Sequence, residues 1–323
     1  MLYDILAIIA GFFLLIWSAD RLVAGAATVA KHLGIPPLIV GITIVGFGTS
    51  APEIMVASIA SLDGSPSLAI GNAIGSNIAN ITLVLGIAAL ITPLEIHSRI
   101  IKKELPLLLL ATAMAIFFLS DNHLGRLDGS ILCGSLFVLM WWITRQALKD
   151  RGTDPLENEY LQETPKAMPL SRALFWLFTG LVLLTVSSKL LVFGAVNIAT
   201  AFGLSELVIG LTIIAVGTSL PELAASIAGA LKGEHDLAIG NVVGSNLFNT
   251  LIVLGIPGLI APSMLDSGVL QRDIPFLLIL TVILFIMAFG FRGAGRINRV
   301  EGFLLTCGFF AYQALLYITV IGK

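Results

Sequence analysis

The strongest constraint in this sequence is that one apolar segment occurs twice. Residues 46–53 read GFGTSAPE, and residues 215–222, reached by adding 169 to each number, read AVGTSLPE. The match continues without a gap, and about half of the positions are identical between 41–86 and 210–255. This is far more than two unrelated apolar segments share. The chain is therefore an internal duplication, and its fold must accommodate two copies of the segment.

The composition predicts an all-α polytopic membrane protein. The chain is 57% hydrophobic and 12% charged, whereas soluble domains carry about 25% charged residues. The net charge of −2 gives no reason to expect nucleic acid as a partner. A transmembrane helix needs about 20 predominantly apolar residues. We predict ten spans, at residues 4–30, 36–60, 67–93, 104–120, 127–147, 171–200, 205–230, 237–261, 274–291 and 299–321.

The polar stretch 149–170 divides these spans into a first repeat at 1–148 and a second at 171–323. Of the 18 Lys and Arg residues, 13 fall in loops on one side and 3 on the other. The positive-inside rule then predicts that both termini lie outside and that the 149–170 connector is cytoplasmic. Because each repeat holds an odd number of spans, equivalent helices cross the membrane in opposite directions. Two inverted five-helix repeats with a site at the midplane are a transporter architecture.

Two further features concern the first span of each half. Apolar sequence begins at Ile5 without a preceding basic region, so we expect a retained span and not a signal peptide. Asp20 maps onto Lys189 under the same offset. These two side chains either pair across the symmetry axis or reach the membrane interface independently.

The repeated segment gathers oxygen atoms at membrane depth. Thr49 and Glu53 are four residues apart and share a face if the segment is helical. Pro52 has no N–H group, so the carbonyl of Gly48 loses its helical partner and the preceding turn is distorted. Ser50 adds a second hydroxyl. Unwound backbone at this depth is tolerated where it lines a cavity, so we predict a broken helix that presents carbonyls, hydroxyls and a carboxylate.

A second motif predicts a polar stripe on the following span. Residues 71–80 read GNAIGSNIAN and residues 240–249 read GNVVGSNLFN. Their glycines, spaced by four, are typical of close helix packing, and we expect this role for Gly71 and Gly75. The stripe consists of Asn72, Ser76 and Asn80 in the first copy and of Asn241, Ser245 and Asn249 in the second.

A carboxylate inside the bilayer costs at least a few kcal/mol and so indicates a functional site. Glu53 and Glu222 stand at matched positions, and neither eight-residue segment contains a Lys or Arg that would neutralise them. Carboxylate, hydroxyl, amide and carbonyl oxygens suit hard cations such as Ca²⁺ and Na⁺, whereas zinc and copper prefer nitrogen and sulfur. The residues therefore predict a cation site with no prosthetic group.

The doubled GTSxPE and GNxxGSN motifs resemble those of the cation/Ca²⁺ antiporters, and specifically the compact prokaryotic members of the sodium/calcium exchanger branch. The resemblance covers essentially the whole chain. It implies ten helices, of which the first and sixth are long and slanted. It also implies an inner-membrane antiporter that exchanges Na⁺ for Ca²⁺ by alternating access, with no obligate protein partner.

The resemblance further implies a role for each matched residue. Glu53 and Glu222 would bind Ca²⁺ at the centre and would also contribute to Na⁺ binding, while Asn80 and Asn249 would line the middle. One flanking Na⁺ site would consist of Thr49, Ser50 and Ser76 with the carbonyl of Gly46. The other would consist of Thr218, Ser219 and Ser245 with the carbonyl of Ala215.

Asn249 departs from some relatives, including potassium-dependent exchangers, which carry Asp at this position. The neutral side chain disfavours a K⁺-coupled cycle. H⁺/Ca²⁺ exchange is an alternative, because a buried Glu can release Ca²⁺ by taking up a proton. A passive cation channel is a second alternative. An intramembrane enzyme with Ser50 or Ser219 as nucleophile is disfavoured, because the four His residues fall in loops or at span edges.

Overall fold

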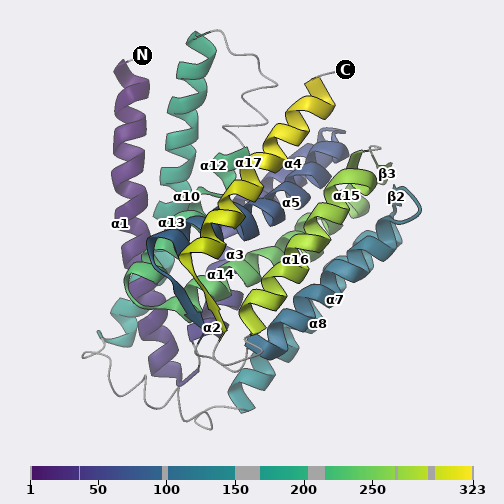
Figure 1. Cartoon of the computed structure of the whole chain (residues 1–323). Helices are drawn as coiled ribbons and strands as arrows, with labels where there is room; N and C mark the ends of the chain where they lie inside the picture. The colour runs from purple at the N-terminus through teal and green to yellow at the C-terminus, as the bar shows by residue number, and fades with distance from the viewer. Residues whose placement is uncertain are drawn as a thin grey trace.

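The computed structural model describes residues 2–35, 37–96, 101–149, 168–202, 215–265, 268–289 and 295–321. Helix dominates this part of the chain (Figure 1). Every one of the ten predicted apolar segments contains helix. Most of the predicted connector, and the first part of the predicted span 205–230, lie outside the described residues.

The helices of the two halves follow the same order. The first half contains α1 (Leu2–Leu33), α2 (Pro37–Val40), α3 (Gly46–Thr49), α4 (Ala51–Leu62), α5 (Pro66–Ala79), α6 (Leu85–Ile91), α7 (Ile101–Leu119) and α8 (Arg126–Lys149). The second half contains α10 (Leu170–Ala201), α12 (Ala215–Thr218), α13 (Leu220–Leu231), α14 (His235–Phe248), α15 (Gly255–Ile260), α16 (Ile274–Phe289) and α17 (Arg299–Ile321). Short π-helices are η1 (Gly41–Val45), η2 (Asn80–Val84), η4 (Asn249–Val253) and η5 (Val269–Asp273). The bounds from α3 to η2 recur from α12 to η4 with the offset of 169.

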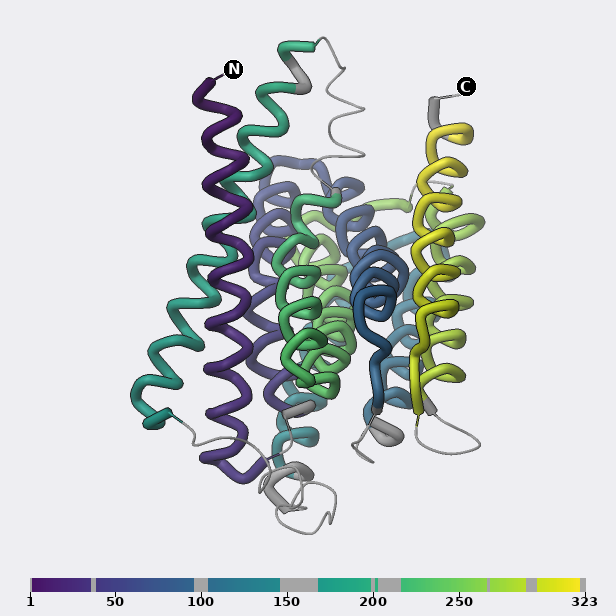
Figure 2. The backbone as a smooth tube through the Cα atoms, turned by 60° about the vertical axis from the view of Figure 1, so that its left-hand side comes forward, coloured from purple at the N-terminus to yellow at the C-terminus, as the bar shows by residue number. Residues whose placement is uncertain are grey.

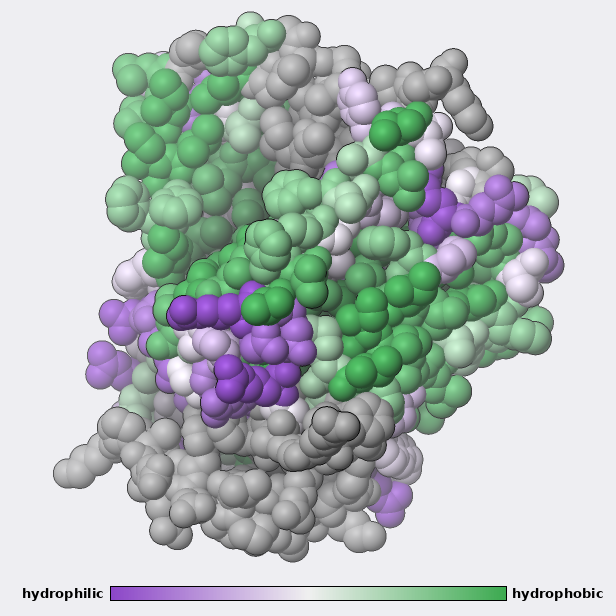
Figure 3. Space-filling model, viewed as in Figure 1, coloured by the Kyte–Doolittle hydropathy of each residue, from purple (hydrophilic) through white to green (hydrophobic). Residues whose placement is uncertain are grey.

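The protein has the surface and the helix lengths of a membrane protein. Among the described residues, seven helices are long and apolar enough to cross a bilayer, or eight if the bent pair Gly41–Thr49 and Ala51–Leu62 is one span. Phe117, Phe137 and Phe303 are examples of large exposed apolar side chains. The coloured part of the surface in Figure 3 is largely hydrophobic. Apolar surface of this extent fits lipid contact.

Two small β-ladders depart from the all-α prediction. Strand β1 (Leu94–Ile96) pairs antiparallel with β4 (Gly295–Ile297), and β2 (His123–Leu124) pairs antiparallel with β3 (Ser263–Met264). Each ladder joins a loop of the first half to a loop of the second. Strands of two or three residues are too short to produce an alternating pattern, so no sequence signal predicts them.

Helices α1 and α10 are the longest, at 32 residues each, and lie side by side in opposite directions (Figures 1 and 2). A Cβ on Gly11 would lie 3.1 Å from the backbone nitrogen of Leu191, and a Cβ on Gly180 would lie 2.9 Å from Leu22 Cα. The offset of 169 converts the first contact into the second. Glycine therefore permits the same close backbone approach twice along this pair.

Aromatic residues join α1 to α10 further along. The rings of Trp17 and Trp176 meet edge-on with centroids 5.6 Å apart, and the Arg21 guanidinium lies over both of them. The two long helices thus form a single unit, here named the α1–α10 unit. Of the two alternatives that the sequence left open for Asp20 and Lys189, the pair across the axis is not formed, because Asp20 Oδ1 lies 2.7 Å from Lys232 Nζ just after α13.

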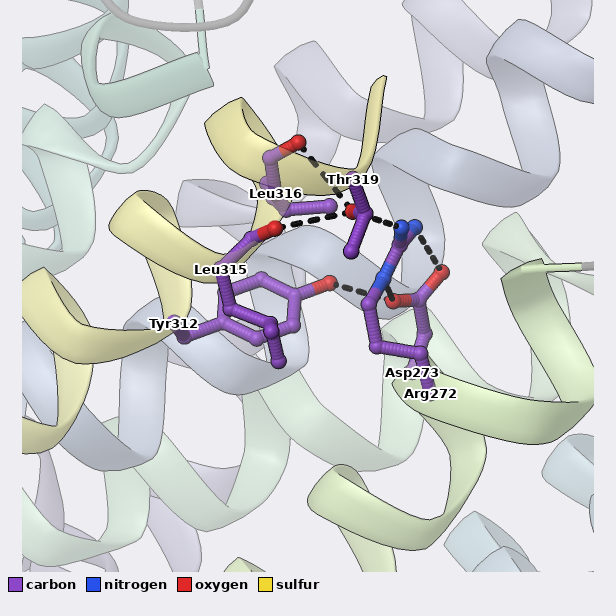
Figure 4. A network of polar contacts seen from close by, with 6 residues as sticks. All are labelled: Arg272, Asp273, Tyr312, Leu315, Leu316 and Thr319. Atoms are coloured by element: carbon purple, nitrogen blue, oxygen red, sulfur yellow. Dashed lines mark hydrogen bonds and ion pairs between the residues drawn. The ribbon is translucent and has the colours of Figure 1, made fainter. Parts of the chain in front are cut away.

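A polar network ties η5 to the last helix (Figure 4). The Arg272 guanidinium donates to both carboxylate oxygens of Asp273, at 2.6 and 3.1 Å, and to Thr319 Oγ1 at 2.7 Å. Tyr312 donates its hydroxyl to Asp273 Oδ1 at 3.0 Å. Because Tyr312 and Thr319 both belong to α17, the network fixes the start of α16 against that helix.

Candidate cation-binding site

Breaks in two helices put Glu53 and Glu222 in the first turn of a new helix. The axis bends by 48° between Gly41–Thr49 and Ala51–Leu62. The break lies at Ser50, whose φ of −81° and ψ of 1° leave the helical region, and Ser219 has nearly the same values, −89° and 5°. The predicted broken helix is thereby confirmed in the first copy, and the second copy has the same local backbone. Each carboxylate gains from its position near a helix N-terminus.

The two carboxylates are completely buried and lack sufficient partners. Glu53 and Glu222 are each 0% exposed. Among the described residues, nothing donates a hydrogen bond to either oxygen of Glu53 or to Oε2 of Glu222. Buried charges in proteins are normally paired or bound to a metal. These oxygens are therefore available to coordinate a cation.

Residues of the second half enclose Thr49, the last residue of α3. Its Oγ1 lies 3.1 Å from Asn241 Oδ1 and 3.2 Å from Ser245 Oγ, both on α14. Ser245 Oγ also lies 3.5 Å from the Gly46 carbonyl oxygen and 3.5 Å from Glu222 Oε1. These atoms form a compact group of oxygens, named here the Thr49 cluster, that combines both halves of the chain.

The grouping of hydroxyls implied by the resemblance differs from this arrangement. Ser245, and not Ser76, is the serine that lies beside Thr49. Ser50 also reaches the other half, because its Oγ donates to Glu222 Oε1 at 3.4 Å. The sequence could not reveal this exchange, since both serines stand at the same position of the repeated motif. Applying the offset of 169 to the Thr49–Ser245 contact pairs Thr218 with Ser76.

Asn241 and Asn72 hold the helices that carry the carboxylates. Asn241 Nδ2 donates to the Glu222 carbonyl at 3.2 Å and to Ser226 Oγ at 3.0 Å. Asn72 Nδ2 donates to the Glu53 carbonyl at 3.4 Å. The sequence placed both residues on the polar stripe without assigning them to the site. The signal that could have assigned Asn72 and Asn241 to the site is that each follows the first glycine of its repeated motif.

Asn80 and Asn249 each begin a π-helix, η2 and η4, in the interior of the protein. Their exposed fractions are 1% and 0%, and no described residue hydrogen bonds to either side-chain amide. A π-helical turn widens the backbone spiral and is frequent at functional sites. Four buried polar atoms thus have no described partner, at the two residues to which the resemblance assigned the middle of the site.

Three further residues were assigned to the site by the resemblance: Ser219, Ser76 and Ala215. Ser219 is buried, and no described residue is a hydrogen-bond partner of its Oγ. Ser76 is 4% exposed. Ala215 begins α12, as Gly46 begins α3.

The two copies of the site are enclosed to different degrees. Thr49 and Asn241 are fully buried, whereas their equivalents Thr218 and Asn72 are only half-buried. A Cβ on Gly46 would lie 3.1 Å from Gly244 Cα, so α3 and α14 touch through their backbones.

The equivalent glycines of α5 have no such contact. A Cβ on Gly75 would meet no described atom within 4 Å, and the same holds for Gly71. The predicted packing role of these two glycines is therefore not found within the described residues, while Gly244 of α14 has it.

The site contains two buried carboxylates without a neutralising partner, one from each of two similar halves of a helical membrane fold. Hydroxyl, amide and carbonyl oxygens surround them. Such a site is typical of membrane transporters of hard cations.

The chain belongs to the sodium/calcium exchanger protein family, whose model matches residues 3–145 and 172–318. It is 49% identical to the protein CaxA of Alkalimonas amylolytica over 98% of this chain and 99% of that one. It is 44% identical to the inner membrane protein YrbG of Escherichia coli, with 98% of each covered. The solved sodium-calcium exchanger NCX_Mj, in crystals soaked without Na⁺ and Ca²⁺, superposes with a TM-score of 0.84 at 29% identity, over 98% of this chain and 99% of that one. These relatives support cation/Ca²⁺ exchange.

Proposed function

We propose that this chain is a secondary active antiporter that exchanges Na⁺ for Ca²⁺ by alternating access. Glu53 and Glu222 bind the two kinds of cation in turn near the middle of the membrane. The observation that carries this proposal is the pair of fully buried carboxylates, one from each half, with oxygens that no described residue satisfies.

The charges of this pair explain why exchange is favoured over simple flow. One Ca²⁺ cancels the two carboxylates, and Na⁺ ions distributed over the carboxylates and the flanking hydroxyls achieve the same. A site without cations would leave two negative charges in a medium of low dielectric constant, which is costly. The site therefore changes sides readily only when it is loaded, which couples the two cations. An inward Na⁺ gradient then drives Ca²⁺ out of the cell.

The hydroxyl groups on either side of the carboxylates act as Na⁺ sites. One lies within the Thr49 cluster and consists of Thr49, Ser245 and the Gly46 carbonyl, with Glu222 at its edge. The other follows from the repeat and consists of Thr218, Ser76 and the Ala215 carbonyl. Ser50 and Ser219 add hydroxyls at the two helix breaks, and Asn80 and Asn249 line the middle.

The architecture behind this mechanism is ten spans in two inverted repeats, 1–148 and 171–323, joined by the cytoplasmic connector 149–170. Support comes from the antiparallel α1–α10 unit, in which the offset of 169 exchanges one close contact for the other. The charge bias of the loops puts both termini outside the inner membrane. Asn72 of the less enclosed copy belongs to the first half of α5, next to the turn between α4 and α5. That turn is at the same end of the molecule as the N-terminus (Figure 2). With the N-terminus outside, we propose that the site faces outward.

Uptake of ⁴⁵Ca²⁺ into proteoliposomes tests this function and separates its rivals. Vesicles are loaded with Na⁺, with choline at neutral pH, or with choline at acid pH, and are then diluted into Na⁺-free buffer. Na⁺/Ca²⁺ exchange predicts uptake with internal Na⁺ only. Uptake with the acid interior alone would instead establish H⁺/Ca²⁺ exchange, and equal uptake in all three would establish a channel. Glu53→Gln vesicles supply the background.

A further inference from the structure

One ion pair fastens the α1–α10 unit to the rest of the protein. Asp20 Oδ1 on α1 lies 2.7 Å from Lys232 Nζ, which directly follows α13. Helix α1 packs along α13: Ala224, Ala225 and Ala228 of α13 belong to the same apolar cluster as the buried face of α1. These small side chains let the two helices come together.

The repeat contains the same pair with its charges exchanged. Adding 169 to Asp20 gives Lys189 on α10, and subtracting 169 from Lys232 gives Asp63 at the end of α4. The backbone is the same at both helix ends: Asp63 and Lys232 have φ values of −79° and −88°. Each is followed by a glycine with positive φ, 77° and 75° respectively. The duplication has thus kept the backbone of both positions and reversed the sign of each side chain.

Only one of the two pairs is formed. Lys189 and Asp63 both lie in the described part of the chain, and no ion pair joins them there. The surface of α4 equivalent to the packed face of α13 is correspondingly uncovered: Met55 is 48% exposed and Ile59 is 54% exposed. Among the described residues, the α1–α10 unit is therefore joined by an ion pair to the end of α13 and by none to the end of α4.

The charge of Asp63 is not stabilised by its own helix. A basic residue at a helix C-terminus interacts favourably with the helix dipole, and an acidic one does not. Lys232 therefore suits the end of α13, whereas Asp63 does not suit the end of α4. A cationic partner on α10 accounts for an acidic residue at this position.

We propose that these residues form two mutually exclusive ionic latches, Asp20–Lys232 and Lys189–Asp63. The first holds the α1–α10 unit against α13 while the site faces outward. The second closes when the unit moves to α4 and the site faces inward. This inference rests on the proposed alternating-access function, since it assigns one latch to each of its two states.

Cross-linking tests the exclusion directly. In a chain whose native Cys133 and Cys307 are replaced by Ala, one variant carries cysteines at positions 20 and 232, and a second carries them at 63 and 189. A short bifunctional maleimide is applied to each variant in membrane vesicles. A control variant carries cysteines at positions 20 and 63, which belong to different latches and are not proposed to pair. A four-cysteine variant then shows whether both links ever form in one molecule.

Both latch pairs are expected to cross-link at least tenfold faster than the control pair, and each link is expected to stop ⁴⁵Ca²⁺ exchange. In the four-cysteine variant, closing one link should prevent the other. A 63–189 rate equal to that of the control, or both links in one molecule, would overturn the latches. If exclusion is observed but the wild-type protein shows no Na⁺-dependent uptake, the proposed function fails and the two-position movement stands.

Charge reversal supplies a second test without cysteines. Asp20→Lys or Lys232→Asp alone should lower the exchange rate by about two- to fivefold, as for a partly exposed ion pair. The double variant Asp20→Lys/Lys232→Asp should recover it. Failure of the double variant to exceed both single variants would contradict pairing as the basis of the effect.

Discussion

The two copies of the site use the same motif but differ in how the protein encloses them. Around the Thr49 cluster, α14 presses against α3 so closely that Gly46 and Gly244 are in backbone contact. Around Thr218, the equivalent Asn72 is half-buried and Gly75 has no described neighbour within 4 Å of a Cβ position. Identical motifs have thus produced one sealed copy and one that is half-buried within the part of the chain that the structure describes.

The α1–α10 unit also packs unequally on the two halves. It packs along α13, whose face toward it is made of alanines, and leaves exposed the Met55 and Ile59 side chains of α4. A duplicated chain that folds asymmetrically can exchange the roles of its halves by moving one unit. In the proposed function, we infer that alternation is a property of packing, since both halves already contain the same motif.

The largest effect on exchange is expected from the two glutamates, which stand at the same position of each copy. Glu53→Gln and Glu222→Gln should each reduce ⁴⁵Ca²⁺ exchange by more than about 100-fold, because a cation in a buried site would lose half of its compensating charge, a change worth about 3 kcal/mol or more. Gln preserves the shape, so the purified variants should remain monodisperse. Asp121→Asn, at an exposed turn, is the control and should exchange normally. Wild-type flux in either Gln variant would contradict the assignment.

A graded effect is expected from the two asparagines. Asn241→Ala removes a fully buried amide that bonds to the Glu222 carbonyl, Ser226 and Thr49, so exchange should fall about 5- to 150-fold. Asn72→Ala removes one longer bond from a half-buried residue and should cost only a few-fold. Initial rates over a range of Ca²⁺ concentrations measure both. Equal losses would mean that enclosure does not distinguish the two copies.

The paired carboxylates and the helix break at Ser50 could be predicted from the motif, because Pro breaks a helix and an unneutralised Glu in an apolar run indicates a site. The motif could not distinguish Ser76 from Ser245 as the neighbour of Thr49, since both stand at the same place in the repeat. Nor could it show that Gly244 packs closely and Gly75 does not. These differences arise from tertiary packing, and two identical motifs give no sign that their neighbours differ.

Other features lay below the resolution of any local pattern. The π-helices that begin at Asn80 and Asn249 depend on hydrogen bonds between residues five apart within a continuous apolar run, where the periodicity hardly changes. The partner of Asp20 was missed because the offset relates Asp20 to Lys189 by symmetry. Residues related by symmetry need not touch.

Accessibility offers a test of the orientation of the two copies. With the native cysteines replaced, Thr218→Cys should react with a membrane-impermeant maleimide, applied from outside to intact cells, at least about tenfold faster than Thr49→Cys. The reason is that the sealed copy reacts only through a minor state, populated at about 0.1–10%. Faster labelling of position 49 would reverse the proposed outward-facing assignment.

The smallest effect separates two glycines at equivalent positions. A Cβ on Gly244 would lie 2.7 Å from Ile42 Cα, so Gly244→Ala should destabilise the protein by about 1–3 kcal/mol and lower its Tm by several degrees. A Cβ on Gly75 meets no described atom within 4 Å, so Gly75→Ala should lower the Tm less than Gly244→Ala does. It should slow exchange if, as proposed, α5 makes a similar close contact in the opposite state. Normal exchange by Gly75→Ala would argue against a symmetric second state.

Anomalous diffraction from crystals soaked with Ca²⁺ tests most directly the claim that both halves contribute to one cation site. We expect a single strong peak between Glu53 and Glu222, about 2.3–2.6 Å from at least one carboxylate oxygen of each. A peak bound to only one of these carboxylates, or Ca²⁺ held elsewhere in crystals of active protein, would contradict it.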